Sequence, residues 1–211
     1  MMLDRLHFCS LSCDMKEDVQ RLESVRARQR GVFSKADLQV LLGERHSAAF
    51  KRRVQALARA GALRRFVRGM YVAREFDVPT LSQRLAEDSY VSFGTVLARH
   101  LVIGTRPERQ LIAARTGRNH VYRGLGIEVV HVHIAEHLDF GHTVEQGVRW
   151  ADAEKAVLDT LYFHLRGRRY PFDVFSDLDV TRLDVERLDT YLARFRNPKF
   201  VTFARSLLDL A

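Results

Sequence analysis

The residues best suited to bind a ligand are hydrogen-bond donors at helical spacing in the first third of the 211-residue chain. From Ser47 to Arg59 the apolar residues Phe50, Val54 and Leu57 recur at i, i+4 and i+7, which places them on one face of a helix. The other side of this helix carries Ser47, Lys51, Arg52, Gln55 and Arg59. A helix with such a face fits the major groove of DNA, where its donors reach base edges. We therefore predict a recognition helix here.

More cations follow in a segment rich in strand-forming residues, ALRRFVRGMYVA, which is interrupted by Arg68-Gly69. This pattern predicts a β-hairpin with a glycine turn. Its arginines, Arg64, Arg65 and Arg68, are suited to contact phosphates. Two earlier helices are predicted, over residues 16–30 and from a Ser34 cap to Gly43, with Asp37 completing a capping box.

Three helices followed by a hairpin are typical of a winged helix-turn-helix. The charge distribution agrees with this interpretation. The chain has a formal net charge of +8, and residues 1–78 hold 16 Lys and Arg against nine Asp and Glu. The remaining residues are nearly neutral, so a DNA-binding module joined to a neutral domain is favoured. The alternative is a basic three-helix bundle whose solvated face binds a protein.

Catalytic and metal-binding patterns are weak. His131 and His133 alternate on one expected strand, but three or four converging ligands are needed for zinc. Glu154 and Asp159 are five residues apart on an expected helix, so they diverge. The chain has no phosphate-binding glycine loop, no Gly-x-Ser-x-Gly elbow and no His-Glu-x-x-His motif. We expect no enzymatic activity, no metal and no cofactor.

The basic module is expected to span residues 16–78, because Pro79 and the loss of excess charge mark a boundary. Residues 79–211 predict an α+β domain with a small sheet flanked by helices and a helical tail. Its strands are expected at residues 109–116, 127–134 and 143–150, with a brief strand at residues 90–92. A helix capped by Asp152 is apolar on two faces and is therefore expected at the centre of the domain, with Lys155 and Asp159 paired across one turn. The tail helices are expected at residues 184–196 and after Asn197.

The first residues have no periodicity, so residues 1–15 are expected to be a disordered extension and Met15 is a candidate start. Asp4 and Arg5 interrupt any signal-peptide core, and no apolar stretch is long enough to span a bilayer. Cys9 and Cys13 do not make a disulfide framework. We expect a soluble, cytoplasmic protein without a membrane partner.

Three segments resemble the AbiEi-type antitoxins of bacterial abortive-infection (type IV) toxin–antitoxin operons. They are VQALARAGALRRFVRGMYVA, YVSFGTVLARHLV and WADAEKAVLDTLYF, within residues 30–165. The last is similar to the family's A-x-x-E-K-A-h-h-D helix (h, apolar), in which Glu154, Lys155 and Asp159 are interpreted as structural residues.

The resemblance implies a DNA-binding transcriptional repressor of its own operon. It also implies a C-terminal domain that counters a nucleotidyltransferase-like toxin encoded next to it, whether or not the two proteins touch. The expected partners are therefore double-stranded operator DNA and such a toxin. The alternative is a winged-helix transcriptional regulator whose second domain senses a ligand or protein, with no toxin involved.

Overall fold

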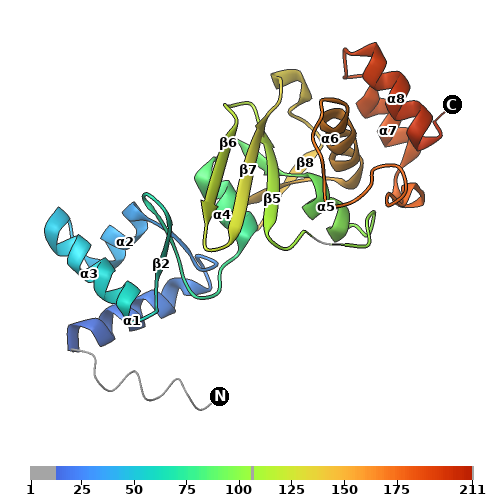
Figure 1. Cartoon of the computed structure of the whole chain (residues 1–211). Helices are drawn as coiled ribbons and strands as arrows, with labels where there is room; N and C mark the ends of the chain where they lie inside the picture. Colours follow the sequence, from blue (N-terminus) through green and yellow to red (C-terminus); the bar gives the residue numbers. More distant parts are fainter. Residues whose placement is uncertain (1–12, 106, 211) are drawn as a thin grey trace. The chain divides into compact units, whose positions relative to one another are not determined.

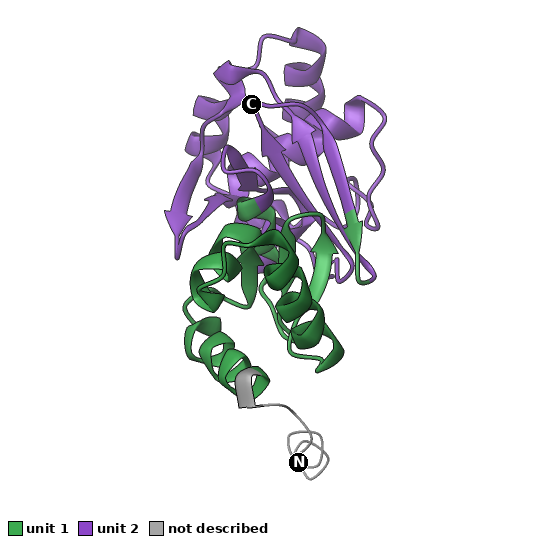
Figure 2. Ribbon diagram, turned by 90° about the vertical axis from the view of Figure 1, so that its left-hand side faces the viewer, with its two compact units in different colours: residues 1–84, 123–125 green, residues 85–122, 126–211 purple. Residues whose placement is uncertain are grey.

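The structure is a computed structural model that describes residues 13–105 and 107–210. The chain divides into two compact units, which are coloured separately in Figure 2 and are described one at a time below. Unit 1 comprises Met1–Arg84 with Arg123–Leu125, and unit 2 comprises Leu85–Tyr122 with Gly126–Ala211. Both helices and sheets occur, so the mixed α+β class predicted from the sequence is confirmed.

Unit 1 is built on helices α1 (Cys13–Arg26), α2 (Lys35–Leu42) and α3 (Ser47–Arg59), which are drawn in blue to teal in Figure 1. Their apolar faces meet in one core, which includes Leu22, Leu38 and Leu57. The predicted capping box of α2 is confirmed: the Ser34 Oγ accepts from the Asp37 N–H, and the Asp37 carboxylate accepts from the Ser34 N–H.

A three-stranded antiparallel sheet completes unit 1, with β1 (Val32–Ser34), β2 (Arg64–Val67) and β3 (Met70–Val72) in the order β1-β3-β2. The predicted hairpin is β2–β3, and its turn is Arg68-Gly69, where glycine adopts φ +83°. Strand β1 was not predicted, because three residues that lead directly into a helix are too few to show alternation.

The first helix differs from its predicted bounds, residues 16–30. It begins at Cys13 and ends at Arg26, and turns occupy residues 27–31. These turns end at Gly31, which has φ +71° and lies against the backbone of Glu75 and Phe76. A Cβ atom at this position would be 2.2 Å from the Glu75 carbonyl oxygen, so the close approach requires glycine. Of the expected extension, residues 1–12 lie outside the described residues, and residues 13–15 are helical.

The division between the units falls after Arg84, six residues beyond the predicted boundary at residue 78. Helix α4 (Val78–Leu85) runs across the predicted boundary, since a proline such as Pro79 is tolerated in the first turn of a helix. Asp77 accepts from the N–H of Thr80 at 2.8 Å and so caps this helix. Proline therefore marks a helix start at this point.

Unit 2 contains a six-stranded mixed sheet with the order β6-β7-β5-β4-β9-β8. Strand β4 pairs antiparallel with β5 and parallel with β9, while β5 pairs parallel with β7 and β8 antiparallel with β9. The strands are β4 (Ser89–Val91), β5 (Gln110–Arg115), β6 (His120–Gly124), β7 (Ile127–His133), β8 (His142–Glu145) and β9 (Val148–Ala151). The predictions for β5 and β7 are confirmed within one residue at either end.

One sequence interpretation of this sheet is wrong, and one strand was missed. The single strand predicted at residues 143–150 is a hairpin, because Gln146 and Gly147 both adopt positive φ and reverse the chain between β8 and β9. Strand β6 was also not predicted, since its residues are mostly exposed and lack an apolar face.

Helix α6 (Ala153–Leu165) is the central helix of unit 2, as predicted, and its residues from Ala153 to Leu161 are all buried. It is contacted by α5 (Phe93–Arg99), α7 (Val185–Leu192) and α8 (Pro198–Leu208), which surround it in Figure 1. Short 3-10 turns lie at Glu136–Leu138 and Val180–Arg182. Helix α7 ends four residues before its predicted end, whereas α8 begins after its Asn197 cap as predicted. Within residues 13–105 and 107–210, no helix combines the length and apolar character that crossing a bilayer requires.

Candidate nucleic-acid interface

Helix α3 is fixed by its buried face. Phe50, Val54 and Leu57 enter the core of unit 1, as their spacing predicts. Ser47, Lys51 and Gln55 consequently lie on the exposed side of the helix. The helix contains no acidic residue, so its outer surface is uniformly cationic or neutral.

Arg53 anchors α3 to the two other helices and was not singled out by the sequence analysis. Its guanidinium forms an ion pair with the buried Asp18 of α1, with the Nε donating to Oδ2 at 2.9 Å. It also donates to the carbonyl oxygen of Leu42, at the end of α2, at 2.6 Å. This one side chain thus links α3 to both α1 and α2.

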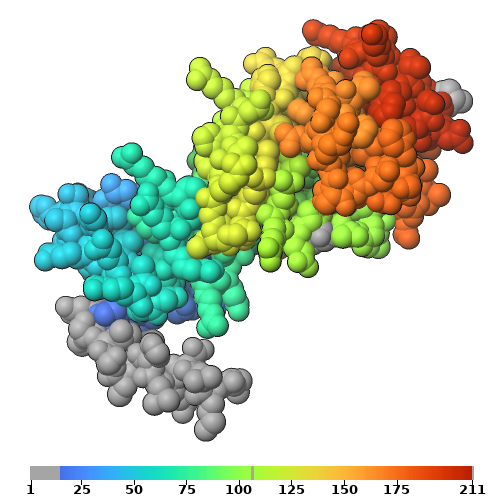
Figure 3. Space-filling view, viewed as in Figure 1, coloured from blue at the N-terminus to red at the C-terminus, as the bar shows by residue number. Residues whose placement is uncertain are grey.

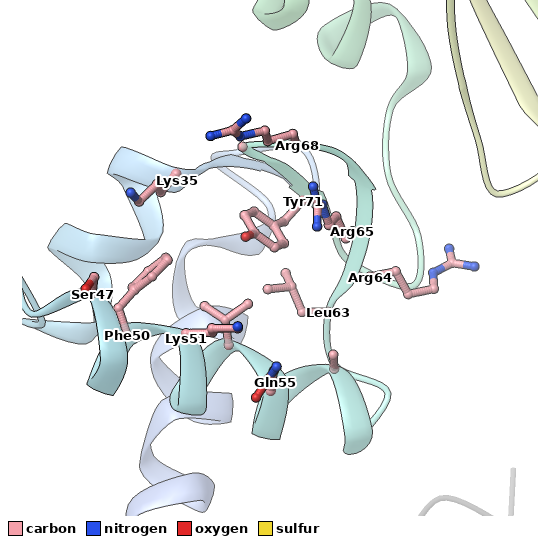
Figure 4. A pocket seen from close by; sticks show the side chains of 13 residues that line it. Lys35, Ser47, Phe50, Lys51, Gln55, Leu63, Arg64, Arg65, Arg68 and Tyr71 are labelled. Carbon is pink, nitrogen blue, oxygen red and sulfur yellow. The ribbon is translucent and has the colours of Figure 1, made fainter.

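A groove of about 810 Å³ lies between α3 and the β2–β3 hairpin. Figure 4 shows it from close by, with Leu63 and Tyr71 directed into the space and Arg68 at the tip of the hairpin. The lining residues come from the start of α2, from α3 and from the hairpin: Lys35, Ser47, Phe50, Lys51, Val54, Gln55, Ala58, Leu63, Arg64, Arg65, Arg68, Gly69 and Tyr71.

The groove combines an apolar floor with a cationic rim. Lys35, Lys51, Arg65 and Arg68 supply positive charge from three different elements, and the described residues that line the groove include no carboxylate. Lys35 was missed by the sequence analysis, because its position at the start of α2 gave no sign that the hairpin folds back beside it. The arrangement can bind a polyanion and, through Gln55 and Ser47, offer neutral donors at the same time.

The predicted site residues separate into two groups. Ser47, Lys51, Gln55 and the three hairpin arginines line the groove. Arg52 and Arg59 are exposed on α3 but do not line it, because they lie further round the helix.

The three hairpin arginines also differ among themselves. The Arg64 side chain points away from α3 in Figure 4, and its guanidinium donates to the carbonyl oxygen of Arg74 at 2.8 Å. The Arg65 Nε donates to the carbonyl oxygen of Val67 at 3.3 Å. Arg65 and Arg68 are therefore the hairpin cations best placed beside α3.

The start of α2 is held by a charged contact. Asp37, which caps the helix with Ser34, also accepts from the Arg84 guanidinium at 2.5 Å. Burial opposes ionisation of Asp37, but the hydrogen bonds from Ser34 and the positive charge of Arg84 outweigh it and lower the pKa of the carboxyl group. The carboxylate that caps α2 is therefore ionised, and Lys35, at the start of the same helix, lines the groove.

In unit 2, the residues interpreted as a structural motif form a buried polar cluster. The Lys155 ammonium is paired with the Asp159 carboxylate, as predicted from their spacing. The other carboxylate oxygen accepts from the Ser92 hydroxyl at 2.8 Å and from the Tyr90 hydroxyl at 3.0 Å. Burial, followed by the negative charge of Asp159, raises the pKa of Tyr90 well above its usual range, so the phenol stays a donor.

Glu154 has different hydrogen-bond partners from Asp159. Its carboxylate is buried and accepts from the N–H of Asp184 at 2.9 Å and from the Arg187 guanidinium at 3.3 Å. It therefore joins the start of α6 to the start of α7, while Asp159 faces β4. The two carboxylates do not converge on a common point for catalysis.

His131 and His133 do not form a shared site either. His131 is completely buried beside the Tyr122 ring, whereas His133 is exposed and its Nδ1 lies 3.0 Å from the carbonyl oxygen of Thr116. Burial, followed by the positive charge of Arg115, lowers the pKa of His131 to about 4. This imidazole is neutral at physiological pH.

The chain is similar in structure to the RV2827C protein from Mycobacterium tuberculosis, which is known from a crystal structure. The similarity has a TM-score of 0.66 with 16% sequence identity, and it covers 95% of this chain and 78% of that one. At this level of identity the likeness shows a shared fold alone. No protein-family model matches the sequence, and comparison with curated proteins gives no match.

Proposed function

We propose that unit 1 is a winged helix-turn-helix that binds double-stranded DNA, with α3 in the major groove and the β2–β3 hairpin as the wing. The observation that carries this proposal is the cationic groove beside α3. Five cations from α2, α3 and the hairpin line it, and none of its described lining residues is acidic. Gln55 and Ser47 are the neutral donors suited to base edges, while Lys35, Lys51, Arg65 and Arg68 are suited to phosphates.

We further propose that the protein is a cytoplasmic antitoxin and autorepressor of a type IV toxin–antitoxin operon. Support comes from the three segments that resemble AbiEi-type antitoxins. In this proposal, unit 1 represses the operon and unit 2 counters a nucleotidyltransferase-like toxin. The polar cluster of Lys155 and Asp159 keeps α6 in place and takes no part in a reaction.

DNA binding is tested by fluorescence anisotropy with a duplex from the region upstream of the gene and a scrambled duplex of equal length. Gln55→Ala is expected to weaken binding to the upstream duplex by about 1–3 kcal/mol and to change binding to the scrambled duplex little. Arg68→Ala is expected to weaken both equally and to reduce the salt slope by about one.

Arg28→Ala is the matched control, because Arg28 is an exposed cation of unit 1 that does not line the groove. It should leave binding to both duplexes nearly unchanged. Equal losses in the Arg28 and Arg68 variants would show that net charge, and not the groove, determines binding.

The antitoxin role is tested by expressing the full chain from a foreign promoter beside the toxin gene. Rescue of growth is expected for the wild type and also for the Lys51→Ala/Arg68→Ala variant, since neutralisation is assigned to unit 2. The absence of a nucleotidyltransferase gene next to this one would overturn the antitoxin role and favour a regulator that senses another partner.

A further inference from the structure

The side chain of Tyr71, on strand β3, is placed in the groove of unit 1 by the register of the sheet. Tyr71 lies opposite Phe33 of β1 and opposite Arg65 of β2, and side chains directly opposite each other in antiparallel strands share one face. Phe33 belongs to the core of unit 1, so this face is turned toward the helices. Tyr71 therefore lines the groove beside Arg65, and Figure 4 shows its ring directed into the space between α3 and the hairpin.

The ring of Tyr71 is held by packing, but its hydroxyl is not used within the protein. The residue is half-buried, and its ring packs against the core of unit 1. Within residues 13–105 and 107–210, the Tyr71 hydroxyl has no hydrogen-bond partner. A phenol hydroxyl can donate a hydrogen bond without carrying a charge. Because the ring already has its position, little conformational entropy is lost when the hydroxyl binds a partner.

The side of the groove that α3 does not supply is formed by the hairpin and the start of α2. These two elements are joined at the hairpin turn, where the Lys35 N–H donates to the Gly69 carbonyl oxygen at 2.8 Å. We call this side the hairpin wall. Its lining cations include Lys35, Arg65 and Arg68, and Tyr71 adds an uncharged donor to them. The neutral donors Ser47 and Gln55, in contrast, belong to α3.

We propose that the Tyr71 hydroxyl donates a hydrogen bond to a phosphate of the DNA backbone, as an uncharged contact among the cations of the hairpin wall. This inference rests on the proposed binding of DNA by unit 1. With α3 in the major groove, base edges are reached from that helix, whereas a hairpin beside it meets the sugar-phosphate backbone. Tyrosine hydroxyls are among the groups that contact phosphates. Figure 3 shows the teal residues of the hairpin at the surface of unit 1, where a duplex can reach them.

The hydroxyl is tested with Tyr71→Phe, which keeps the ring and removes only the donor. Binding of the full chain to the upstream and scrambled duplexes is measured by fluorescence anisotropy over a range of salt concentrations. The variant is expected to bind both duplexes about tenfold more weakly, because hydrogen bonds to charged groups are strong. The salt slope should stay unchanged, since no charge is lost, whereas Arg68→Ala lowers it by about one. The melting temperature should equal that of the wild type, because the hydroxyl has no partner among the described residues.

The phosphate is located by replacing one phosphate at a time in the upstream duplex with an uncharged methylphosphonate. At the position that Tyr71 contacts, the methylphosphonate and Tyr71→Phe together should weaken binding by less than the product of their separate effects. Coupling at one position or at two neighbouring positions supports the inference. The absence of coupling at every position overturns it.

Tyr162→Phe is the matched control. Tyr162 is also half-buried and loses the same atom, but it lies on α6 of unit 2. It should leave DNA binding unchanged. The inference is overturned if Tyr71→Phe keeps the wild-type affinity, if it weakens binding to the upstream duplex alone, or if it changes the salt slope. A wild type that binds neither duplex would instead refute the proposed function, so the two failures are distinguishable.

Discussion

Replacing Asp159 by Asn tests whether the buried polar cluster stabilises unit 2 as its geometry indicates. The substitution keeps the size of the side chain and an oxygen that can accept from the Tyr90 and Ser92 hydroxyls. It removes the only carboxylate paired with the Lys155 ammonium among the described residues. Lys155 is completely buried, with its ammonium 4.9 Å from the Phe140 ring centroid and 5.4 Å from that of Tyr90.

Breaking a buried ion pair on one side costs about 3–5 kcal/mol, because the remaining charge is left without compensation. The nearby aromatic rings offset a small part of this cost. Folded domains are stable by about 5–15 kcal/mol, so Asp159→Asn is expected to remove a large fraction of the stability of unit 2. Lys155→Met in the same chain removes the uncompensated charge and should recover about 2 kcal/mol.

Urea unfolding followed by tryptophan fluorescence measures this effect in the right unit. Trp150 is the single tryptophan of the chain and lies in β9 of unit 2. The reasoning is refuted if Asp159→Asn lowers the free energy of unfolding by less than about 1 kcal/mol, or if Lys155→Met destabilises the Asp159→Asn variant further.

Three further predictions concern stability. Arg53→Met leaves the buried Asp18 carboxylate without its cation and should lower the free energy of unfolding of unit 1 by about 2–4 kcal/mol in urea titrations followed by circular dichroism; an unchanged midpoint would contradict the anchoring role. His131 has a folded-state pKa of about 4, below its ordinary value of 6.5, so the unfolded chain binds a proton first as pH falls. The contribution of neutral His131 to the free energy of unfolding is therefore present above pH 6.5 and is lost between pH 6.5 and 4, by up to about 3 kcal/mol. The His131→Asn variant should show a shallower dependence of this free energy on pH. Gly31→Ala combines a positive φ with a clash and should lower the melting temperature more than Gly61→Ala, which has φ +72° and open space, so equal losses would count against the close approach.

Local signals in the sequence predicted much of the fold. The capping box of Ser34 and Asp37, the Asn197 cap and the Arg68-Gly69 turn each involve residues a few positions apart, and each occurs as predicted. The spacing of Phe50, Val54 and Leu57 also sufficed to orient α3. Such features are decided by the backbone chemistry of a few neighbouring residues.

Features that depend on contacts distant in sequence were not predicted. Arg53 meets Asp18 across 35 positions, and Lys35 joins the groove only because the hairpin folds back beside α2. Strand β6 is mostly exposed, so its sequence carries no alternation, and its place in the sheet depends on β7. A single sequence shows the type of each residue but not which distant residue it will face.

The position of β4 in the sheet has a consequence for synthesis of the chain. Strand β4 is buried at all three residues and lies between β5 and β9, but Val91 precedes its partner Trp150 by 59 positions. While the intervening residues emerge from the ribosome, one edge of this strand, which is buried in the folded protein, stays unpaired. Unpaired strand edges are sites where chains aggregate. Truncated chains that end before β9 should therefore aggregate, because this edge of β4 stays open until β9 has been made.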